Sequence, residues 1–377
     1  MKQLLSYLQL EQPAGLRLLE QMVHMESPSN EKALVDKFAR FAGSQFEALG
    51  GVVDYIPAER FGDHLRVRFP GKTSEKILLL GHTDTVFPAG EVAKRPFQIR
   101  NGRATGPGVF DMKAGILIAW SAMKALLKSH SPFQHSVTVL LTSDEEMGST
   151  TSRALLESEA SSARAVLVLE PSLPGGRLKT ARKGVGRFTI KAIGRAAHAG
   201  IDPTNGINAI EEIARQVLVL QSMGDARMGT TVTVGVIQGG TRSNVVPAEA
   251  GVEVDVRVAS NAEAARMTTA IHALQARIPG ARLEVRGAIN RPPMERTTAT
   301  AQLFELAKAA GAELDIDLSE GSTGGASDGN FTSALGIPTL DGLGAIGDGA
   351  HSVDEYVDVA SLPVRAALLA SLIQRIH

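Results

Sequence analysis

The chain has 377 residues, enough for two domains at the usual size of about 100–200 residues each. Its 39 Lys and Arg residues are balanced by 40 Asp and Glu residues, so no basic excess favours a nucleic acid or a membrane surface as partner. The absence of cysteine excludes disulfides, thiolate-bound metals and cysteine nucleophiles. Any metal site must therefore be built from His, Asp and Glu.

The apolar runs of the sequence are much shorter than the roughly 20 residues that a membrane span requires. Polar residues, among them Gln9 and Glu11, interrupt the N-terminal apolar stretch, which argues against a secretory signal. We expect the chain to begin with an amphipathic helix and to be cytoplasmic, with neither a membrane nor a nucleic acid as partner.

The first half of the chain alternates between two patterns of apolar residues. The segments with helical spacing are Leu16–Met25, Glu31–Leu49 and Ala114–Lys128. The short continuous apolar runs are Ile77–Leu80, Val137–Leu141 and Ala165–Leu169. Strands buried on both faces and separated by helices are typical of a parallel α/β sheet.

From about Gly184 the pattern changes to strands with one polar face. The strands expected here are Arg187–Ile193, Thr231–Ile237, Val252–Val258 and Ala281–Arg286, and the helices are Asn205–Gln221 and Ala262–Arg277. The resulting order, strand–helix–strand–strand–helix–strand, is that of the ferredoxin-like fold.

The last part of the chain returns to the first pattern, with a helix over Thr300–Gly311, a strand over Pro338–Leu340 and a helix from Leu362. We therefore predict an α/β domain formed by residues 1–182 and 293–377. It would be interrupted by an inserted α+β domain over residues 183–292.

Polar side chains directly follow the three buried strands of the first half. His82 and Asp84 follow the first strand, and Glu145 and Glu146 follow the second. Glu170 follows the third. Because the carboxyl ends of parallel strands meet at one edge of a sheet, we expect these side chains to converge there.

Two further residues belong to this set. Asp111 comes just before the helix Ala114–Lys128, and His351 ends the Gly-rich loop after Pro338–Leu340. Several carboxylates at one place are costly unless a cation compensates their charge. Carboxylate and imidazole ligands without thiolate suit Zn²⁺, Mn²⁺ or Co²⁺.

The same residues lie in five segments that resemble a known family. The segments are Gly-His82-Thr-Asp84, Gly-Pro-Gly-Val-Phe-Asp111-Met-Lys, Thr-Ser-Asp-Glu145-Glu146-Met-Gly, Leu-Glu170-Pro and Ala-His351-Ser-Val-Asp-Glu-Tyr. Together they resemble the M20 family of dinuclear zinc peptidases and deacylases, and most of all its glutamate carboxypeptidase (carboxypeptidase G) branch. The motifs occur in the family's order and span nearly the whole chain. The resemblance implies an α/β zinc-peptidase catalytic domain with an inserted ferredoxin-like lid and dimerisation domain.

The resemblance also implies a pair of bound zinc ions in each subunit, with Co²⁺ or Mn²⁺ as alternatives. His82 and Glu170 would bind one ion, and Glu146 and His351 would bind the other. Asp111 would bridge the two ions, which jointly activate a water molecule.

Two more roles follow from the resemblance. Glu145 would be the general base that takes the water's proton and passes it to the leaving nitrogen. Asp84 would orient His82 from behind. Glu at position 170, where aminopeptidase branches have Asp, favours carboxypeptidases and N-acyl deacylases.

The segment Arg-Ala-Ala-His198-Ala-Gly resembles the family segment whose His reaches the active site of the partner subunit and stabilises the oxyanion. A homodimer formed through residues 183–292 is therefore expected.

Substrate contacts are implied for four more residues. Asn244 and Arg257 lie in segments that resemble those near the family's substrate, and Gly325 lies in a Gly-rich loop at the metal pocket. Arg291 is placed to bind a substrate carboxylate, for which a guanidinium offers two parallel hydrogen bonds.

Several functions remain open. The leading one is an amide hydrolase that releases a C-terminal amino acid, such as glutamate, from a small peptide. An N-acyl amino acid deacylase, of the acetylornithine deacetylase or succinyl-diaminopimelate desuccinylase type, shares the chemistry, and Arg291 discriminates between the two.

A metal-binding or partner-binding protein without catalysis is a further alternative. The pattern Gly342-Leu-Gly-Ala-Ile-Gly347 resembles a dinucleotide fingerprint but runs into His351 rather than a helix, which argues against an oxidoreductase.

Overall fold

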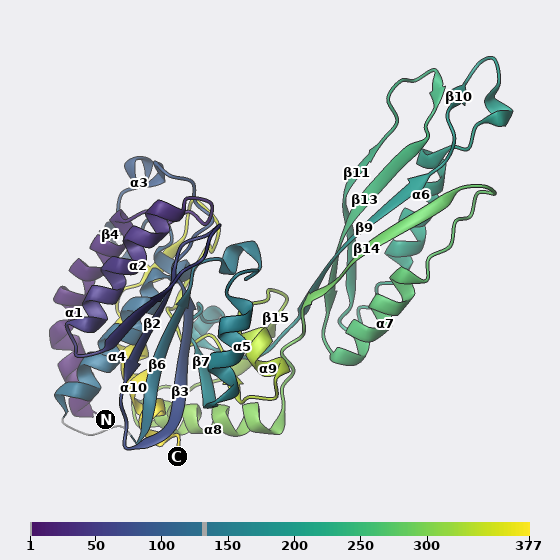
Figure 1. Cartoon of the computed structure of the whole chain (residues 1–377). Coiled ribbons are helices and arrows are strands. Elements are labelled where there is room, and N and C mark those ends of the chain that lie inside the picture. Colours follow the sequence, from purple (N-terminus) through teal and green to yellow (C-terminus); the bar gives the residue numbers. More distant parts are fainter. Residues whose placement is uncertain (1, 130–133) are drawn as a thin grey trace. The chain divides into compact units, whose positions relative to one another are not determined.

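The computed structural model describes residues 2–129 and 134–377, and the chain divides into two compact units (Figure 1). Unit 1 takes the residues up to Ala181, then Arg296–Thr323 and Ser327–His377. Unit 2 takes Arg182–Glu295 and Gly324–Ala326. Each unit has a hydrophobic core of its own.

The main sheet of unit 1 has the strand order β1-β2-β6-β3-β7-β16. Its strands are β1 (Val52–Ile56), β2 (His64–Phe69), β3 (Thr73–His82), β6 (His135–Thr142), β7 (Ala163–Val168) and β16 (Thr339–Leu340). The strands β6, β3, β7 and β16 run parallel, as predicted, but β1 and β2 add an antiparallel pair. The parallel arrangement expected for the three apolar strands is confirmed, and the antiparallel pair was not predicted. β1 is a partly exposed edge strand without a continuous apolar run, so its sequence carries little strand signal.

Alternate residues of β3 face two different hydrophobic layers. Ile77 and Leu79 belong to the larger core, and Leu78 and Leu80 belong to the core on the other face of the sheet. The helices of the larger core are α1 (Lys2–His24), α2 (Lys32–Glu47), α4 (Ala114–Lys128), α8 (Thr298–Ala312) and α10 (Ser361–Arg375). The opposite layer contains α5 (Arg153–Ser161) and α9 (Gly329–Ala334). The strands predicted to be buried on both faces are thus buried on both faces.

The expected N-terminal amphipathic helix and the predicted helical segment from Leu16 form one helix. It begins at Lys2, and Pro13 lies inside it. Leu8 packs into the larger core, with Leu4 and Leu5 against it, so tertiary contacts extend the helix toward the N-terminus.

Short elements of unit 1 hold the loops at the edge of the main sheet. One small sheet has the order β17-β18-β5-β4, formed by β4 (Gln98–Arg100), β5 (Arg103–Thr105), β17 (Gly347–Asp348) and β18 (Tyr356–Asp358). A second pairs β8 (Leu178–Arg182) with β15 (Glu320–Thr323), and the short helix α3 (Glu91–Lys94) precedes β4. The pairing of β18 with β5 joins the segment after His351 to the segment before Asp111.

Unit 2 contains one antiparallel sheet with the order β11-β13-β9-β14. Its main elements in chain order are β9 (Gly184–Ile193), α6 (Ala209–Ser222), β11 (Thr231–Gly239), β13 (Glu249–Val258), α7 (Asn261–His272) and β14 (Arg282–Arg291). Both helices pack on one face of the sheet, where their apolar residues meet those of β9 and β13. The predicted ferredoxin-like element order is confirmed.

The helix α7 ends at His272, five residues before the predicted end at Arg277. The carboxylate of Glu212 accepts hydrogen bonds from the backbone N–H groups of Arg277 and Ile278, at 2.9 Å and 2.7 Å. This side chain satisfies the backbone in place of further helical hydrogen bonds.

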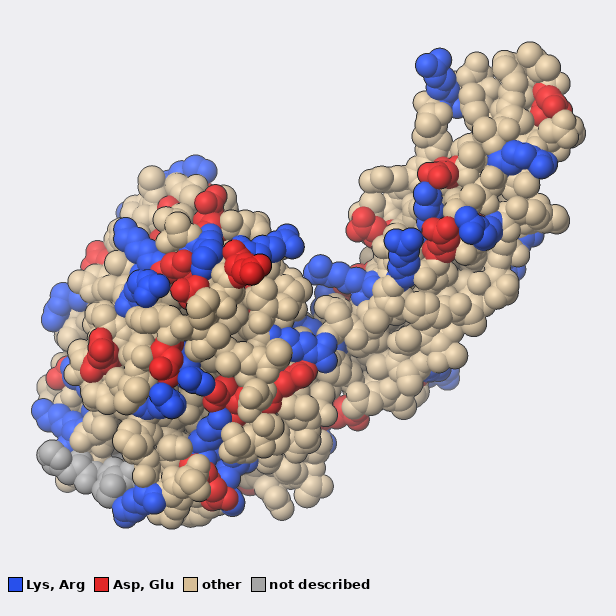
Figure 2. All heavy atoms as spheres, in the orientation of Figure 1, with Lys and Arg blue, Asp and Glu red and all other residues tan. Residues whose placement is uncertain are grey.

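Basic and acidic side chains are interspersed over the face drawn in Figure 2, in both units, in keeping with a formal net charge of −1. Within residues 2–129 and 134–377, no helix is both long enough and apolar enough to cross a membrane.

Candidate metal centre

Three neighbouring parallel strands bring the predicted ligands to one edge of the main sheet. His82 ends β3 and lies in register with Thr142, which ends β6. The turn after β6 contains the short helix η2 (Glu145–Met147), and Glu170 follows β7 by two residues. The strand order of unit 1 thus brings residues that are far apart in sequence together in one cluster.

Asp111 lies between the two predicted histidine ligands, in the turn η1 (Val109–Lys113) that leads into α4. Its Oδ1 lies 3.2 Å from Nε2 of His82, and its Oδ2 lies 3.3 Å from Nε2 of His351. Each oxygen of one carboxylate therefore faces a different imidazole. This is the arrangement that a carboxylate bridging two cations about 3.5–4 Å apart requires.

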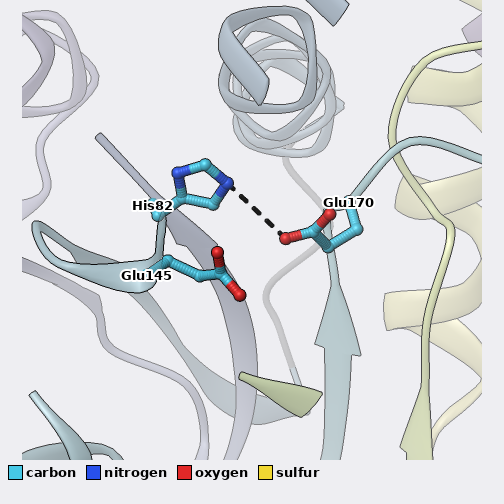
Figure 3. A group of neighbouring side chains, drawn as sticks. All are labelled: His82, Glu145 and Glu170. Carbon is cyan, nitrogen blue, oxygen red and sulfur yellow. Dashed lines mark ion pairs between the residues drawn. The ribbon is translucent and has the colours of Figure 1, made fainter. Parts of the chain in front are cut away.

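Each histidine also faces a second carboxylate. Nε2 of His351 lies 3.2 Å from Oε2 of Glu146, and Nε2 of His82 lies 3.5 Å from Oε1 of Glu170. Figure 3 shows the side chains of His82, Glu145 and Glu170 pointing toward one another, and their potential ligand atoms all lie within 4.8 Å. Glu145 and Glu146 are adjacent in sequence and both lie near His82, and Glu146 also lies beside His351.

The cluster contains more acidic than basic groups. Two imidazoles face five carboxylates, those of Asp84, Asp111, Glu145, Glu146 and Glu170. Even with both histidines protonated, ionised carboxylates would outnumber them. Divalent cations would compensate this charge.

Burial and mutual contacts shift the pKa values of the cluster. Burial raises the pKa of Glu146 to about 7, and burial also raises the pKa of Glu170. Burial opposes the charge of Asp111 too, but the two imidazoles outweigh it and hold the pKa of Asp111 below its ordinary value. The contacts with Asp111 and Glu146 raise the pKa of His351 to about 11. Burial lowers the pKa of His82, yet its carboxylate neighbours outweigh burial and leave it well above the ordinary value.

Asp84 is fully buried and collects hydrogen bonds from several directions. Its Oδ2 accepts from Oγ of Ser29 at 2.7 Å and from the N–H of Glu146 at 3.2 Å, and its Oδ1 accepts from the N–H of Glu145 at 3.2 Å. Nδ1 of His82 lies 2.9 Å from the carbonyl oxygen of Asp84 and 3.4 Å from Oδ1. The predicted role of Asp84 in orienting His82 requires a contact of this kind with Nδ1. The sequence did not predict that Asp84 would also accept hydrogen bonds from the backbone N–H groups of both glutamates.

The residues present fit a pair of divalent cations. Oε1 of Glu146 is buried and has no hydrogen-bond partner among the described residues. The cluster offers two imidazoles and several carboxylates as ligands, and the chain has no thiolate. This donor set suits Zn²⁺, Co²⁺ or Mn²⁺.

Comparison with known proteins agrees with the resemblance of the motifs. A family model for peptidase family M20/M25/M40 matches residues 78–375. The chain belongs to this family. Carboxypeptidase G2 from Pseudomonas sp. is 32% identical over 374 residues, covering 96% of this chain and 89% of the relative. Succinyl-diaminopimelate desuccinylase from Thioalkalivibrio sulfidiphilus is 30% identical over 327 residues, covering 81% of this chain and 85% of the relative.

A solved structure, the aminopeptidase PepT from Bacillus cereus, shares the fold with a TM-score of 0.81 at 23% identity, covering 97% of this chain and 98% of PepT. The M20 chain is therefore a metallopeptidase or amidohydrolase. Its curated relatives act on different substrates, so the comparisons leave its own substrate open.

In this M20 chain, His198 lies in an arm of unit 2 formed by β10 (Ala197–His198) and β12 (Val245–Val246). The side chain is exposed, and its Nδ1 accepts hydrogen bonds from the N–H groups of Gly200 at 3.1 Å and Ile201 at 3.2 Å. With Nδ1 as acceptor, the neutral ring carries its proton on Nε2. Nε2–H is then available to donate outward.

Asn244 belongs to the same arm, because its carbonyl oxygen accepts a hydrogen bond from the N–H of Ala199. Arg257 and Arg291 lie at the other end of the unit 2 sheet, on either side of Val185 in β9. From Val185 to the end of β9 nearest the arm is about 26 Å at 3.3 Å per residue. Within one chain, the four expected contact residues of unit 2 thus form two separate groups.

Gly325 lies in the short segment Gly324–Ala326, which packs with unit 2 although the chain on both sides belongs to unit 1. Nη1 of Arg182 donates to the carbonyl oxygen of Gly325 at 3.1 Å, and Nη1 of Arg257 donates to that of Gly324 at 3.4 Å. These contacts explain why three residues from the segment 293–377 pack with the inserted domain.

The sequence interpretation missed Ser29, whose hydroxyl contacts Asp84 across 55 residues of chain. It also gave no role to Asp328, which accepts a hydrogen bond of 2.9 Å from Thr142 at the end of β6. Asp328 follows Gly325, in the Gly-rich loop expected at the metal pocket, by three residues. No sequence pattern marked Ser29, because its contact with Asp84 forms only in the folded chain.

Proposed function

We propose that this protein is a two-metal hydrolase that cleaves an amide bond and releases a C-terminal amino acid, in the manner of a glutamate carboxypeptidase. The observation that supports it most is the position of Asp111, whose two oxygens face His82 and His351 separately. The similarity to carboxypeptidase G2 over 96% of the chain favours this substrate class.

The proposed ligand sets follow the contacts of the cluster. His82 and Glu170 would hold one Zn²⁺, Glu146 and His351 would hold the second, and Asp111 would contribute to both; Co²⁺ or Mn²⁺ could replace zinc. Such a pair supplies an activated water molecule and polarises the substrate carbonyl. The buried oxygen of Glu146 without a protein partner supports a ligand role for that side chain.

Glu145 is the proposed general base. Its carboxylate lies with His82 and Glu170, and its backbone N–H is held by Asp84. It accepts a proton from the attacking water and delivers it to the leaving nitrogen. Because a positioned acid–base group contributes about 10²–10⁴-fold, this carboxylate is central to the proposal.

Substrate recognition is assigned to unit 2. Arg291 binds the free carboxylate next to the scissile amide, and Arg257 and Asn244 contribute further polar contacts. Gly325 brings its backbone close to the substrate. His198 donates from Nε2 to the oxyanion at the site of a partner subunit, a role that its hydrogen bonds at Nδ1 allow.

A homodimer formed through unit 2 accompanies this role. In the described chain, β11 is an edge strand of the unit 2 sheet, and a strand edge can pair with a second copy. Ile237 on β11 is 58% exposed, and Leu218 on α6, which packs beside β11, is 73% exposed. A second copy of this edge and helix would cover these apolar side chains by twofold symmetry.

The alternative is an N-acyl amino acid deacylase. The 30% identity to a succinyl-diaminopimelate desuccinylase supports it, and the metal cluster serves both reactions equally well. The difference is expected at Arg291, whose removal should impair turnover of substrates with a free carboxylate beside the scissile bond.

The experiment that tests the proposal is amino-acid release by zinc-loaded protein. The panel holds N-benzoyl-glutamate, an Ala-Glu dipeptide, pteroyl-glutamate, N-acetylornithine and succinyl-diaminopimelate. We expect preference for the glutamate amides, with Arg291→Ala raising KM for them. Arg286→Ala is the matched control, because Arg286 lies on the same strand with its side chain 83% exposed. Preference for the last two compounds would support the deacylase, and metal-loaded protein inactive on the whole panel would contradict both.

A further inference from the structure

The two segments that carry Asp111 and His351 are joined by a buried carboxylate to which the proposed function gives no role. Glu355 follows His351 by four residues and is 1% exposed. Its Oε1 accepts a hydrogen bond of 3.1 Å from the N–H of Val109, and the N–H of Gly108 also donates to this carboxylate. Val109 begins the turn η1 that contains Asp111. A side chain from one ligand's segment therefore holds the backbone of the other ligand's turn.

His351 needs such a hold because its own loop is weakly anchored. Residues 350–354 are exposed, and His351 has a φ of +64°, a left-handed conformation that costs a non-glycine residue about 1 kcal/mol or more. Gly349 has a φ of +80°, and a Cβ there would lie 2.9 Å from Cα of Glu355. Nη1 of Arg95 donates to the carbonyl oxygen of Val353 at 2.7 Å. Glu355 is the buried side chain at the end of this exposed loop.

The turn with Asp111 has an independent anchor on its other side. Lys113 is buried, and its Nζ donates to the carbonyl oxygen of Met25 at 2.8 Å, beside the ring of Phe38. Asp111 is therefore fixed to the body of unit 1 by Lys113, whereas Glu355 connects it to the loop of His351. Loss of Glu355 should displace His351 more than Asp111.

We propose that Glu355 is a positioning residue that sets the separation between Asp111 and His351 and thereby the affinity for the cation held by Glu146 and His351. The inference rests on the two-ion assignment of the proposed function. Loss of Glu355 should affect the two ions differently, because the ion assigned to His82 and Glu170 does not depend on the loop of His351.

The expected effect follows from the hydrogen bonds. Glu355→Ala leaves the N–H groups of Gly108 and Val109 without their buried acceptor, while Glu355→Gln keeps one acceptor oxygen. Residues that orient metal ligands typically contribute 10–100-fold to metal affinity. We expect Glu355→Ala to weaken the binding of one of the two zinc ions by about 10–100-fold, and Glu355→Gln to weaken it less.

The experiment measures zinc stoichiometry and affinity on the full chain by titration and metal analysis over a series of buffered free-zinc concentrations. Cobalt spectra report the geometry of each site. Glu212→Ala and Glu212→Gln are matched controls, because Glu212 is a fully buried carboxylate that also accepts hydrogen bonds from two backbone N–H groups, but in unit 2. Thermal unfolding compares the stability of all four variants.

The expected result is that wild-type protein and both Glu212 variants bind two zinc ions, while the Glu355 variants lose one ion at a free zinc concentration that keeps both on the wild type. Glu355 variants that bind both ions as tightly as the wild type, with a loss of stability like that of the controls, would overturn the positioning role. Because Glu355→Gln changes the structure least, it decides the question if Glu355→Ala does not fold. Wild-type protein that binds fewer than two ions would instead contradict the proposed function itself.

Discussion

The hydrogen bonds of Asp84 predict a large loss of activity from the isosteric substitution Asp84→Asn. Three donors converge on this carboxylate, namely Oγ of Ser29 and the N–H groups of Glu145 and Glu146. An amide of the same shape has one acceptor oxygen and one NH₂ group, which is itself a donor. At least one of the three donors would then face another donor in a fully buried position.

The magnitude follows from these contacts. A buried hydrogen bond to a charged group contributes about 1.5–3 kcal/mol, so the loss of one should lower the free energy of unfolding by about that amount. The effect on the reaction comes through His82 and the two glutamates, whose orientation depends on Asp84. Substitutions of this kind reduce activity or metal affinity by about 10–100-fold. This corresponds to about 1.4–2.7 kcal/mol of transition-state stabilisation.

The assay is kcat/KM on the best substrate of the panel, together with zinc content and thermal unfolding of the same preparations. Ser29→Ala is the comparison, because it removes one donor and leaves the carboxylate with both backbone hydrogen bonds. We expect its kcat/KM to fall by less than that of Asp84→Asn. An Asp84→Asn enzyme with unchanged kcat/KM and zinc content would refute the argument that Asp84 positions the cluster.

Three further outcomes are expected. Glu145→Gln should retain zinc but lower kcat by about 10²–10⁴-fold, and a smaller loss would exclude Glu145 as the general base. Burial raises the pKa of Glu146 to about 7, so the metal-free folded chain keeps a proton that the unfolded chain releases near pH 4.5. Stability of chelator-treated protein should therefore fall as pH rises from about 4.5 to 7, and a rise in Tm over this range would contradict the shift. Leu218→Asp and Ile237→Asp should each convert a dimer to monomers in light scattering, and a dimer that survives both changes would exclude the interface at β11 and α6.

The element order of unit 2 could be predicted because its sheet has one buried face. Val252, Val254 and Val256 alternate with charged residues, so the strand and its buried side are visible in sequence. The end of α7 could not be predicted, because it depends on Glu212, which lies 65 residues before Arg277 in the chain. The periodicity of apolar residues within a segment does not show which distant residues will contact that segment.

The candidate ligands could be found from the sequence because each parallel strand is recognisable as a short apolar run, and the polar residues that follow mark its end. His82, Glu145, Glu146 and Glu170 each follow a short apolar run, and parallel strands place their carboxyl ends on one edge. Asp111 was found from its place just before a predicted helix, and His351 from its place at the end of the Gly-rich loop after Pro338–Leu340. The side-chain contacts of these residues, as distinct from their presence in one cluster, required the structure.

Pattern and motif in the sequence thus determined the fold class, the family and the set of residues that meet at the sheet edge. Tertiary structure alone decided that β2 joins the sheet antiparallel to both of its neighbours, that each oxygen of Asp111 faces a different histidine, and that Ser29 and Glu355 hold the segments around the cluster. The physical reason is the range of the interactions. Hydrophobic periodicity is a local property of the chain, whereas a hydrogen bond between Glu355 and Val109 joins residues 246 positions apart and exists only once the chain has folded.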